Sequence, residues 1–282
     1  QIKINQAGRK NFRPPPIIKF KRKNRYMEFD EIRTFFFDIE KTLTRWDDTV
    51  IGAEDLIMSL KESGKKVRFH TDNTLLTREK YAEKLRGMNI EASEDEILTS
   101  GYLTAQLLAE KDVKKAYVVG EEGLINELEN EDIDFSEDAE NVVVGLDRQF
   151  SYNKLRRAQN ILEDGGDMYF CSTETTFRRS SGDRPHQKAL NEALKVFGEG
   201  EVTGKPSDHF RRGFKDYFSY YPENGMFIGD RLADIETGNR LGLKTAAVLT
   251  GEISEEKLKR ADEIQRPDVA LSSLAKLRRR VL

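Results

Sequence analysis

The sequence predicts an α/β protein built around a parallel β-sheet. Short apolar runs alternate with amphipathic segments from residue 31 onward, which is the pattern of strands separated by crossover helices. Residues 34–37, Thr-Phe-Phe-Phe, read as a continuous apolar run, as expected for a strand buried on both faces. The alternation and the buried first strand together favour a parallel sheet covered by helices.

The predicted elements alternate in order along the chain. Thr77 is a good N-cap for a helix, and so is Ser254. No internal repeat of fixed period is evident. Strands are predicted at 34–37, 66–69, 116–119, 142–144, 168–170, 225–228, 245–249 and 269–271, and helices at 53–63, 77–86, 101–110, 124–128, 151–162, 210–217, 235–241 and after Ser254.

Composition limits the class of protein. The 282 residues are 37% hydrophobic and 34% charged, as in an ordinary folded, soluble protein. No run of 18 apolar residues occurs and no secretory signal peptide is evident, so neither a membrane span nor secretion is predicted. The single cysteine, Cys171, excludes an internal disulfide and a four-thiolate zinc site. It fits a reducing cytoplasm, which is the predicted location.

The net charge of −3 conceals a basic head and an acidic body. Residues 1–26 carry nine basic residues and no acidic one, whereas the other 256 carry 38 basic and 50 acidic residues, a net charge of −12. The head contains three consecutive prolines and no apolar periodicity. We expect either a basic extended arm or an extension ahead of a native start at Met27. An arm of this charge would suit nucleic acid or an acidic partner.

Four carboxylates follow predicted strands. Asp38 and Glu40 lie two residues apart after the first strand, and Asp230 and Asp234 follow the strand at 225–228. Open α/β sheets bind ligands at the carboxyl ends of their strands. Each pair taken alone is more often a turn or a helix cap. Taken together, four carboxylates form a hard-oxygen site of the kind that Mg²⁺ occupies beside phosphate.

Two further segments suit a phosphate group. Residues 71–74, Thr-Asp-Asn-Thr, follow the second predicted strand and offer hydroxyl and amide groups. Residues 204–206, Gly-Lys-Pro, place one cation on a restricted loop. Such segments are usually only a turn and a loop. Their order along the chain relative to the four carboxylates makes them stronger evidence for a phosphate site than either segment alone.

These motifs resemble the haloacid dehalogenase-like phosphatases, in the branch related to p-nitrophenylphosphatases and to nucleotide and sugar phosphate phosphatases. The resemblance covers about residues 31–274 and includes VTGKP at 202–206 and FIGDRLADIETGNRLGLKTAAVLTG at 227–251. It implies a doubly wound, Rossmann-like core of residues 27–112 and 200–282. A smaller α/β cap domain, residues 113–199, would be inserted between the second and third motifs.

The same resemblance implies an Mg²⁺-dependent phosphomonoester hydrolase. Asp38 would attack phosphorus and form an aspartyl phosphate. Glu40 would protonate the leaving oxygen and then activate water. The implied phosphate-binding residues are Thr71, Asn73 and Lys205, and the implied metal ligands are Asp38, the backbone carbonyl of Glu40, Asp230 and, directly or through water, Asp234.

Three positions depart from the family pattern. Glu40 stands where aspartate is usual, and its extra methylene moves the carboxyl group by roughly 1 Å or more. Asp72 replaces an asparagine and adds negative charge near an anionic substrate. Lys41 replaces a common glycine and is expected to offset part of that charge. The alternative function is therefore a catalytically weakened, phosphatase-like binding or scaffold protein.

The remaining expectations concern partners and the histidines. The main partner would be a small phosphorylated metabolite, with a homodimer and the nucleic acid or acidic partner of the head as further options, and no membrane. His70 is expected to pack beside the sheet, and Cys171 to be a buried small residue. His186 and His209 have no partners at metal-ligand spacing, which argues against zinc.

Overall fold

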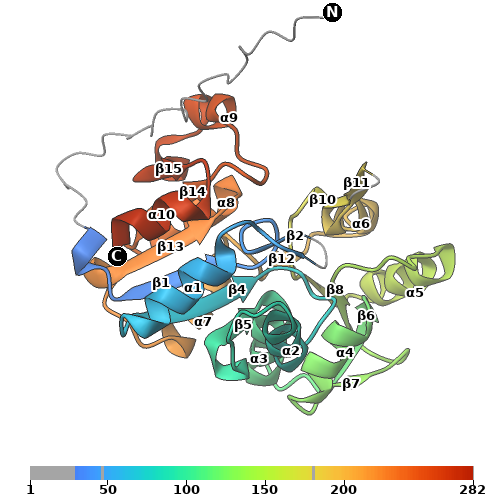
Figure 1. Ribbon diagram of the computed structural model, residues 1–282. Coiled ribbons are helices and arrows are strands. Elements are labelled where there is room, and N and C mark those ends of the chain that lie inside the picture. The colour runs from blue at the N-terminus through green and yellow to red at the C-terminus, as the bar shows by residue number, and fades with distance from the viewer. Residues whose placement is uncertain (1–28, 46–47, 180–181, 282) are drawn as a thin grey trace, which may run out of the picture.

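Two parallel β-sheets organise the part of the chain that the structure, a computed structural model, describes: residues 29–45, 48–179 and 182–281 (Figure 1). The basic arm expected at residues 1–26 lies outside these residues. Among the described residues, no helix is long and apolar enough to span a membrane.

The larger sheet has six strands in the order β15-β14-β13-β1-β4-β5, all parallel. The central strand β1 lies between β4 and β13, and these two neighbours are far apart from each other in sequence. The strands are β1 (Thr34–Asp38), β4 (Lys66–Thr71), β5 (Ile97–Thr99), β13 (Gly225–Gly229), β14 (Lys244–Val248) and β15 (Val269–Leu271). The helices of this part are α1 (Ala53–Glu62), α2 (Arg78–Gly87), α3 (Ser100–Glu110), α7 (Asp208–Tyr217), α8 (Leu232–Arg240), α9 (Glu255–Arg260) and α10 (Leu274–Val281), with short 3-10 turns at Phe29–Glu31, Glu94–Glu96, Pro222–Asn224 and Glu263–Gln265.

Strand β1 is buried on both faces, as its sequence predicts. Phe35 and Phe37 pack with α1, α2 and α10 on one face of the sheet. Phe36 points to the other face and packs among aromatic side chains of α7, including Phe214. Every residue of β1 is buried. The last residue of the strand, Asp38, is therefore held by packing on both sides.

A second, five-stranded parallel sheet has the order β12-β9-β8-β6-β7. Helices α3 and α4 cover one face, and α5 and α6 cover the other. This smaller α/β unit interrupts the larger one in sequence, so the predicted fold class, a parallel α/β core with an inserted cap, is confirmed. Its elements are β6 (Lys115–Val119), α4 (Glu122–Glu129), β7 (Asp134–Phe135), β8 (Asn141–Val144), α5 (Tyr152–Glu163), β9 (Asp167–Phe170), α6 (Gln187–Leu194) and β12 (Glu201–Val202).

Helix α3 packs against both units. Its residues Ala105, Leu107 and Leu108 join the apolar cluster under the cap sheet. Leu103 packs instead with the aromatic cluster of α7. One helix thus fixes the cap sheet beside the core sheet.

The structure also contains elements that were not predicted. A hairpin of β10 (Thr176–Arg179) and β11 (Gly182–Pro185) precedes α6, and β2 (Thr44–Arg45) pairs with β3 (Asp48–Thr49). Helix α10 was also missed, because it is short and rich in arginine. It buries Leu274, Leu277 and Val281 along one face. The predicted caps are present: the Thr77 and Ser254 hydroxyls accept from the amides of Lys80 and Lys257.

Phe36 should be the apolar anchor of the core sheet. Its ring centroid lies 4.8 Å from that of Phe214 and 5.2 Å from that of Tyr220. We expect Phe36→Ala to lower the free energy of unfolding by about 3–5 kcal/mol, because it leaves a cavity in a packed cluster. The control is Phe135→Ala, since Phe135 is 45% exposed at the edge of the cap sheet. Urea unfolding measures both variants, and equal losses would contradict the expectation.

Candidate active site

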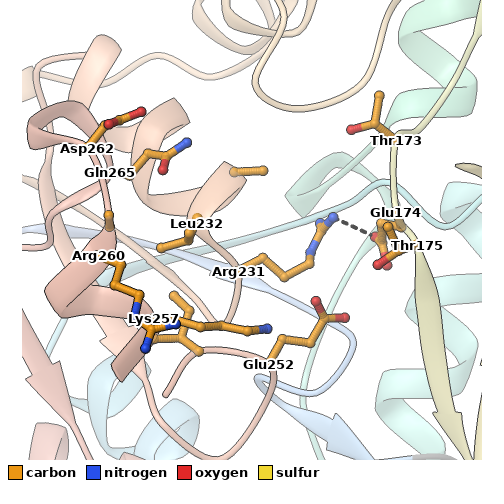
Figure 2. Close-up of a pocket in the computed structure, with 13 residues that line it drawn as sticks. Thr173, Glu174, Thr175, Arg231, Leu232, Glu252, Lys257, Arg260, Asp262 and Gln265 are labelled. Carbon is orange, nitrogen blue, oxygen red and sulfur yellow. Dashed lines mark ion pairs between the residues drawn. The ribbon is translucent and has the colours of Figure 1, made fainter. Parts of the chain in front are cut away.

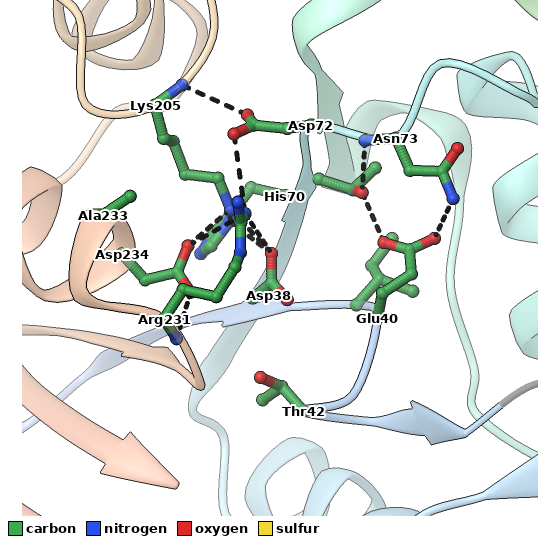
Figure 3. Close-up of polar contacts among 12 residues, drawn as sticks. Asp38, Glu40, Thr42, His70, Asp72, Asn73, Lys205, Arg231, Ala233 and Asp234 are labelled. Carbon is green, nitrogen blue, oxygen red and sulfur yellow. Dashed lines mark hydrogen bonds and ion pairs between the residues drawn. The ribbon is translucent and has the colours of Figure 1, made fainter. Parts of the chain in front are cut away.

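The site begins where the central strands of the core sheet end. Asp38 is the last residue of β1 and lies opposite His70 of β4 in the parallel register. Thr71 ends β4, and Asp230 follows β13, the other neighbour of β1. Because the carboxyl ends of neighbouring parallel strands meet at one edge, these residues come together there. Figure 3 shows Asp38, His70 and Asp234 side by side at this edge.

A fully buried lysine joins three of these elements. The Nζ of Lys205 lies 2.6 Å from Oδ1 of Asp38, 2.7 Å from Oδ1 of Asp234 and 3.1 Å from Nδ1 of His70. Burial disfavours the charged ammonium, but Asp234 and Asp38 outweigh that effect and raise the pKa of Lys205. Lys205 therefore stays cationic inside a cluster of carboxylates.

The carboxylates of the cluster crowd one another. Burial raises the pKa of Asp38 well above its usual range, with Lys205 opposing and Asp234 adding to the shift. Burial and Asp234 likewise raise the pKa of Asp230 to about 7. Because burial penalises the ionised forms of both carboxylates, further positive charge would stabilise those forms.

The donor set fits a divalent cation. Ligand atoms of Asp38, His70 and Asp234 lie within 4.8 Å of one another, and in this structure the Lys205 ammonium contacts all three side chains. Asp234 already accepts from Lys205 and from the backbone amide of Arg231, 3.0 Å away. Asp230 accepts from the Glu252 amide on one oxygen, while its other oxygen lies 3.4 Å from the Thr42 hydroxyl. Asp230 thus has more capacity for a cation than Asp234, and hard oxygen donors suit Mg²⁺.

Glu40 belongs to a separate hydrogen-bonded group (Figure 3). Its carboxylate accepts from the hydroxyl of Tyr81 at 2.9 Å, from Nδ2 of Asn73 at 3.3 Å and from the hydroxyl of Thr71. The backbone amide of Asn73 in turn donates to the Thr71 hydroxyl at 3.0 Å. The structure thus brings Glu40 together with two of the predicted phosphate-binding residues. Tyr81 was not among the predicted site residues.

Arg231 also was not predicted, although it stands between two predicted carboxylates in sequence. Its NH2 lies 3.5 Å from Oδ2 of Asp72, 3.5 Å from Oδ1 of Asp234 and 3.9 Å from Oδ1 of Asp38. Asp72 also accepts from the backbone amide of Lys205 at 3.2 Å. Burial raises the pKa of Asp72 to about 6, while Lys205 and Arg231 oppose the shift. The unusual carboxylate at position 72 is therefore flanked by two cations.

Two contacts join the cap to the core beside the site. Glu174, in the loop after β9, forms an ion pair with NH1 of Arg231 at 2.9 Å. Burial would raise the pKa of Glu174, but Arg231, His186 and Lys41 lower it to about 2. Lys41 donates to the Thr176 carbonyl at 3.1 Å and pairs with Glu252. Lys41 thus forms its ion pair with Glu252 rather than with Asp72, whose charge it was expected to offset.

His70 packs as expected and also contacts the charged cluster. Its ring stacks on Phe227 with centroids 4.1 Å apart. Burial, Lys205 and Arg231 lower the pKa of His70 well below its usual range. The ring is therefore neutral, and Nδ1 accepts from the Lys205 ammonium. His70 contributes both packing and a hydrogen bond that orients Lys205.

The sequence is similar to two families of hydrolases and to several phosphatases. Residues 35–134 match the haloacid dehalogenase-like hydrolase family, and residues 202–277 match a second, HAD-hydrolase-like family. The glycerol-3-phosphate phosphatase of Rattus norvegicus is 30% identical over 270 residues, 83% of this chain and 84% of that protein. Phosphoglycolate phosphatase 1A, chloroplastic, of Arabidopsis thaliana is 27% identical over 277 residues, 87% of this chain and 76% of that protein.

A solved structure agrees with these matches. The 4-nitrophenylphosphatase of Thermotoga maritima superposes with a TM-score of 0.83 at 26% identity, covering 91% of this chain and all of that one. The chain belongs to the haloacid dehalogenase-like hydrolases. Within that family it is a phosphatase, a hydrolase of phosphoric monoesters.

Cys171 is the buried small residue that was expected. It is fully buried, and its sulfur lies 3.3 Å from the Thr104 hydroxyl. Burial raises the pKa of its thiol to about 12. At pH 8, we expect iodoacetamide to label the native protein at least about 10³-fold more slowly than the protein unfolded in guanidinium, because the thiolate is the nucleophile. Mass spectrometry follows the reaction, and native labelling within tenfold of the unfolded rate would contradict the expectation.

Proposed function

We propose that this protein hydrolyses a small organic phosphate through an aspartyl phosphate on Asp38, with Mg²⁺ as the divalent cation. The contact between Asp38 and Lys205, 2.6 Å apart and buried at the carboxyl end of β1, is the observation that carries the proposal. The pair offers a nucleophilic oxygen and, beside it, a cation for the phosphoryl group. Relatives named for phosphoglycolate, glycerol 3-phosphate and 4-nitrophenyl phosphate support a small substrate.

In the first step an oxygen of Asp38 attacks phosphorus and the bond to the leaving oxygen breaks. Glu40 gives its proton to that oxygen. In the second step water attacks phosphorus, the bond to Asp38 breaks, and Glu40 takes the proton of the water. Two smaller barriers replace one large one.

The neighbours of Glu40 support its position beside the phosphoryl group. Thr71 and Asn73, proposed to bind phosphoryl oxygens, both donate to the Glu40 carboxylate. A phosphoryl group held by them would therefore lie beside that carboxylate. Tyr81 is a positioning residue, because its hydroxyl donates to Glu40 from the buried face of α2.

The metal would be held by oxygen ligands only. Asp38, Asp230 and the backbone carbonyl of Glu40, with support from Asp234, would hold Mg²⁺, which supplies positive charge against the phosphoryl oxygens. Burial, together with Asp234, raises the pKa of Asp38 and of Asp230, and a bound cation would favour the ionised form of both carboxylates.

The proposal includes the division of the chain into two domains. We assign the catalytic core to residues 27–112 and 200–282 and the cap to 113–199. Strand β12 (Glu201–Val202) pairs with β9, which favours a second boundary a few residues later than 199. The cytoplasmic location, a homodimer and a nucleic acid or acidic partner for residues 1–26 stay predictions.

Replacing the nucleophile tests the reaction. We expect Asp38→Asn to lower kcat for p-nitrophenyl phosphate by at least about 10³-fold, because the amide does not form the covalent intermediate. Asp55→Asn is the control, since Asp55 lies on α1 with a side chain 65% exposed. Release of p-nitrophenol with Mg²⁺, and after removal of Mg²⁺ with EDTA, measures both variants. Activity that is unchanged in Asp38→Asn or in EDTA would overturn the proposal.

The length of the Glu40 side chain separates the active enzyme from the weakened alternative. The contacts to Tyr81 and Asn73 are made by the glutamate carboxylate, so we expect Glu40→Asp to lower kcat. Glu40→Gln should cost about 10²–10⁴-fold, because it removes the acid and base. Steady-state rates on p-nitrophenyl phosphate measure both. A gain of tenfold or more in Glu40→Asp combined with Asp72→Asn would instead favour the weakened, scaffold-like protein.

A further inference from the structure

A pocket of about 440 Å³ opens beside the predicted phosphoryl site (Figure 2). Its core side is formed by the start of α8 and by α9 with the residues after it. Its cap side is the loop Thr173, Glu174 and Thr175. Ligand pockets for small molecules typically measure about 300–1,000 Å³, so the pocket has room for a metabolite.

Arg231 connects this pocket with the cluster around Asp38. Its NH1 pairs with Glu174 on the cap side of the pocket, 2.9 Å away, while its NH2 lies 3.9 Å from Oδ1 of Asp38. The guanidinium therefore borders both spaces. A substrate whose phosphorus is next to Asp38 would extend its leaving group past Arg231 and into the pocket.

Some of the charged side chains that line the pocket form ion pairs with described residues, and others form none with them. Arg231 and Glu174 neutralise each other, and Glu252 pairs with Lys41. The side-chain cations of Lys257 and Arg260, three residues apart on α9, have no ion-pair or hydrogen-bond partner among the residues that the structure describes.

The third carboxylate of the pocket lining, Asp262, lies away from Arg231 and Glu252. Figure 2 shows Asp262 next to Gln265, at the opposite side of the pocket from Glu252. The figure also shows the amino group of Lys257 reaching toward the Glu252 side, below Arg231. The part of the pocket nearest Arg231 and Lys257 is thus left with positive charge. The two polar residues at the far side suit hydroxyl groups.

We propose that this pocket binds a second anionic group, a carboxylate or a phosphate, on the leaving-group side of the substrate, and that Lys257 and Arg260 select for it. The inference rests on the proposed phosphatase function and narrows it to phosphomonoesters that carry a second anionic group. Arg260 offers a planar fork of donors that matches a carboxylate or phosphate, and Lys257 offers a point charge. Both side chains are exposed, so they act on substrate preference rather than as an absolute requirement.

Matched substrates test the proposal. 3-Phosphoglycerate and glycerol 3-phosphate have similar size and differ by one carboxylate, and fructose 1,6-bisphosphate presents a second phosphate instead. We expect the intact protein to prefer one of the two compounds that carry a second anionic group. In Lys257→Gln and in Arg260→Gln, the ratio of kcat/KM for that compound to kcat/KM for glycerol 3-phosphate should fall by about three- to tenfold, mainly through KM.

A control variant and a binding measurement complete the experiment. Lys259→Gln removes an exposed cation from the same helix but outside the pocket, and it should keep the wild-type ratio. Titration calorimetry of 3-phosphoglycerate and of fructose 1,6-bisphosphate into Asp38→Asn with Mg²⁺ measures binding without turnover. In the Asp38→Asn background, we expect Lys257→Gln and Arg260→Gln to weaken binding of the preferred compound by a similar factor.

The outcomes distinguish the two proposals. If no phosphate ester is turned over, the proposed function fails. The calorimetry alone then shows whether Lys257 and Arg260 bind an anionic group in the pocket. If the ratio and the affinity of both anionic compounds are unchanged in Lys257→Gln and Arg260→Gln, the pocket assignment is overturned while the phosphatase stands. A loss in Lys259→Gln equal to that in the pocket variants would also overturn it, because general surface charge would then be the cause.

Discussion

The site depends on one buried ammonium group. The Nζ of Lys205 lies within 2.7 Å of two carboxylates, Asp38 and Asp234, and donates a hydrogen bond to Nδ1 of His70. A buried charge is tolerated only when it is paired, and removing one partner leaves a costly unpaired ion. Lys205 thus ties the loop before α7 to the ends of β1 and β4 and to the start of α8. Arg231 adds a second positive charge 3.5 Å from Asp234 and Asp72, and the burial of Asp38 and Asp230 leaves their ionised forms open to stabilisation by a bound cation.

Packing delivers these groups to one place. The Phe-Phe-Phe run of β1 is buried on both faces, so the direction and end of this strand are fixed by the two apolar clusters around it. Its neighbours β4 and β13 are parallel to it and end at the same edge. The position of Asp38 is therefore determined by side chains that take no part in the chemistry. The cap then meets this edge through Glu174 and Lys41.

The elements that could be predicted from the sequence are those whose buried residues form a clear apolar run or period along the chain. Strand β1 and the helices that begin at good N-caps belong to this group, and so do the carboxylates that directly follow buried strands. Arg231 and Tyr81 were missed because their roles arise from distant partners: Arg231 meets Glu174 of the cap, and Tyr81 reaches Glu40 from α2. Spacing in one sequence contains no signal for such contacts. Helix α10 was missed because a short arginine-rich segment becomes a helix mainly through tertiary packing.

The two residues that depart from the family pattern at positions 40 and 72 are accommodated by contacts with their surroundings. Glu40 is one methylene longer than aspartate, and its carboxylate is held by three donors, among them the buried hydroxyl of Tyr81. A longer side chain held in this way loses little of the precision that catalysis needs. Asp72 adds a charge, but it accepts from the Lys205 amide and lies 3.5 Å from Arg231, which also pairs with the cap. Each departure is thus compensated by a contact from another element, which favours a working site with its own geometry over a decayed one.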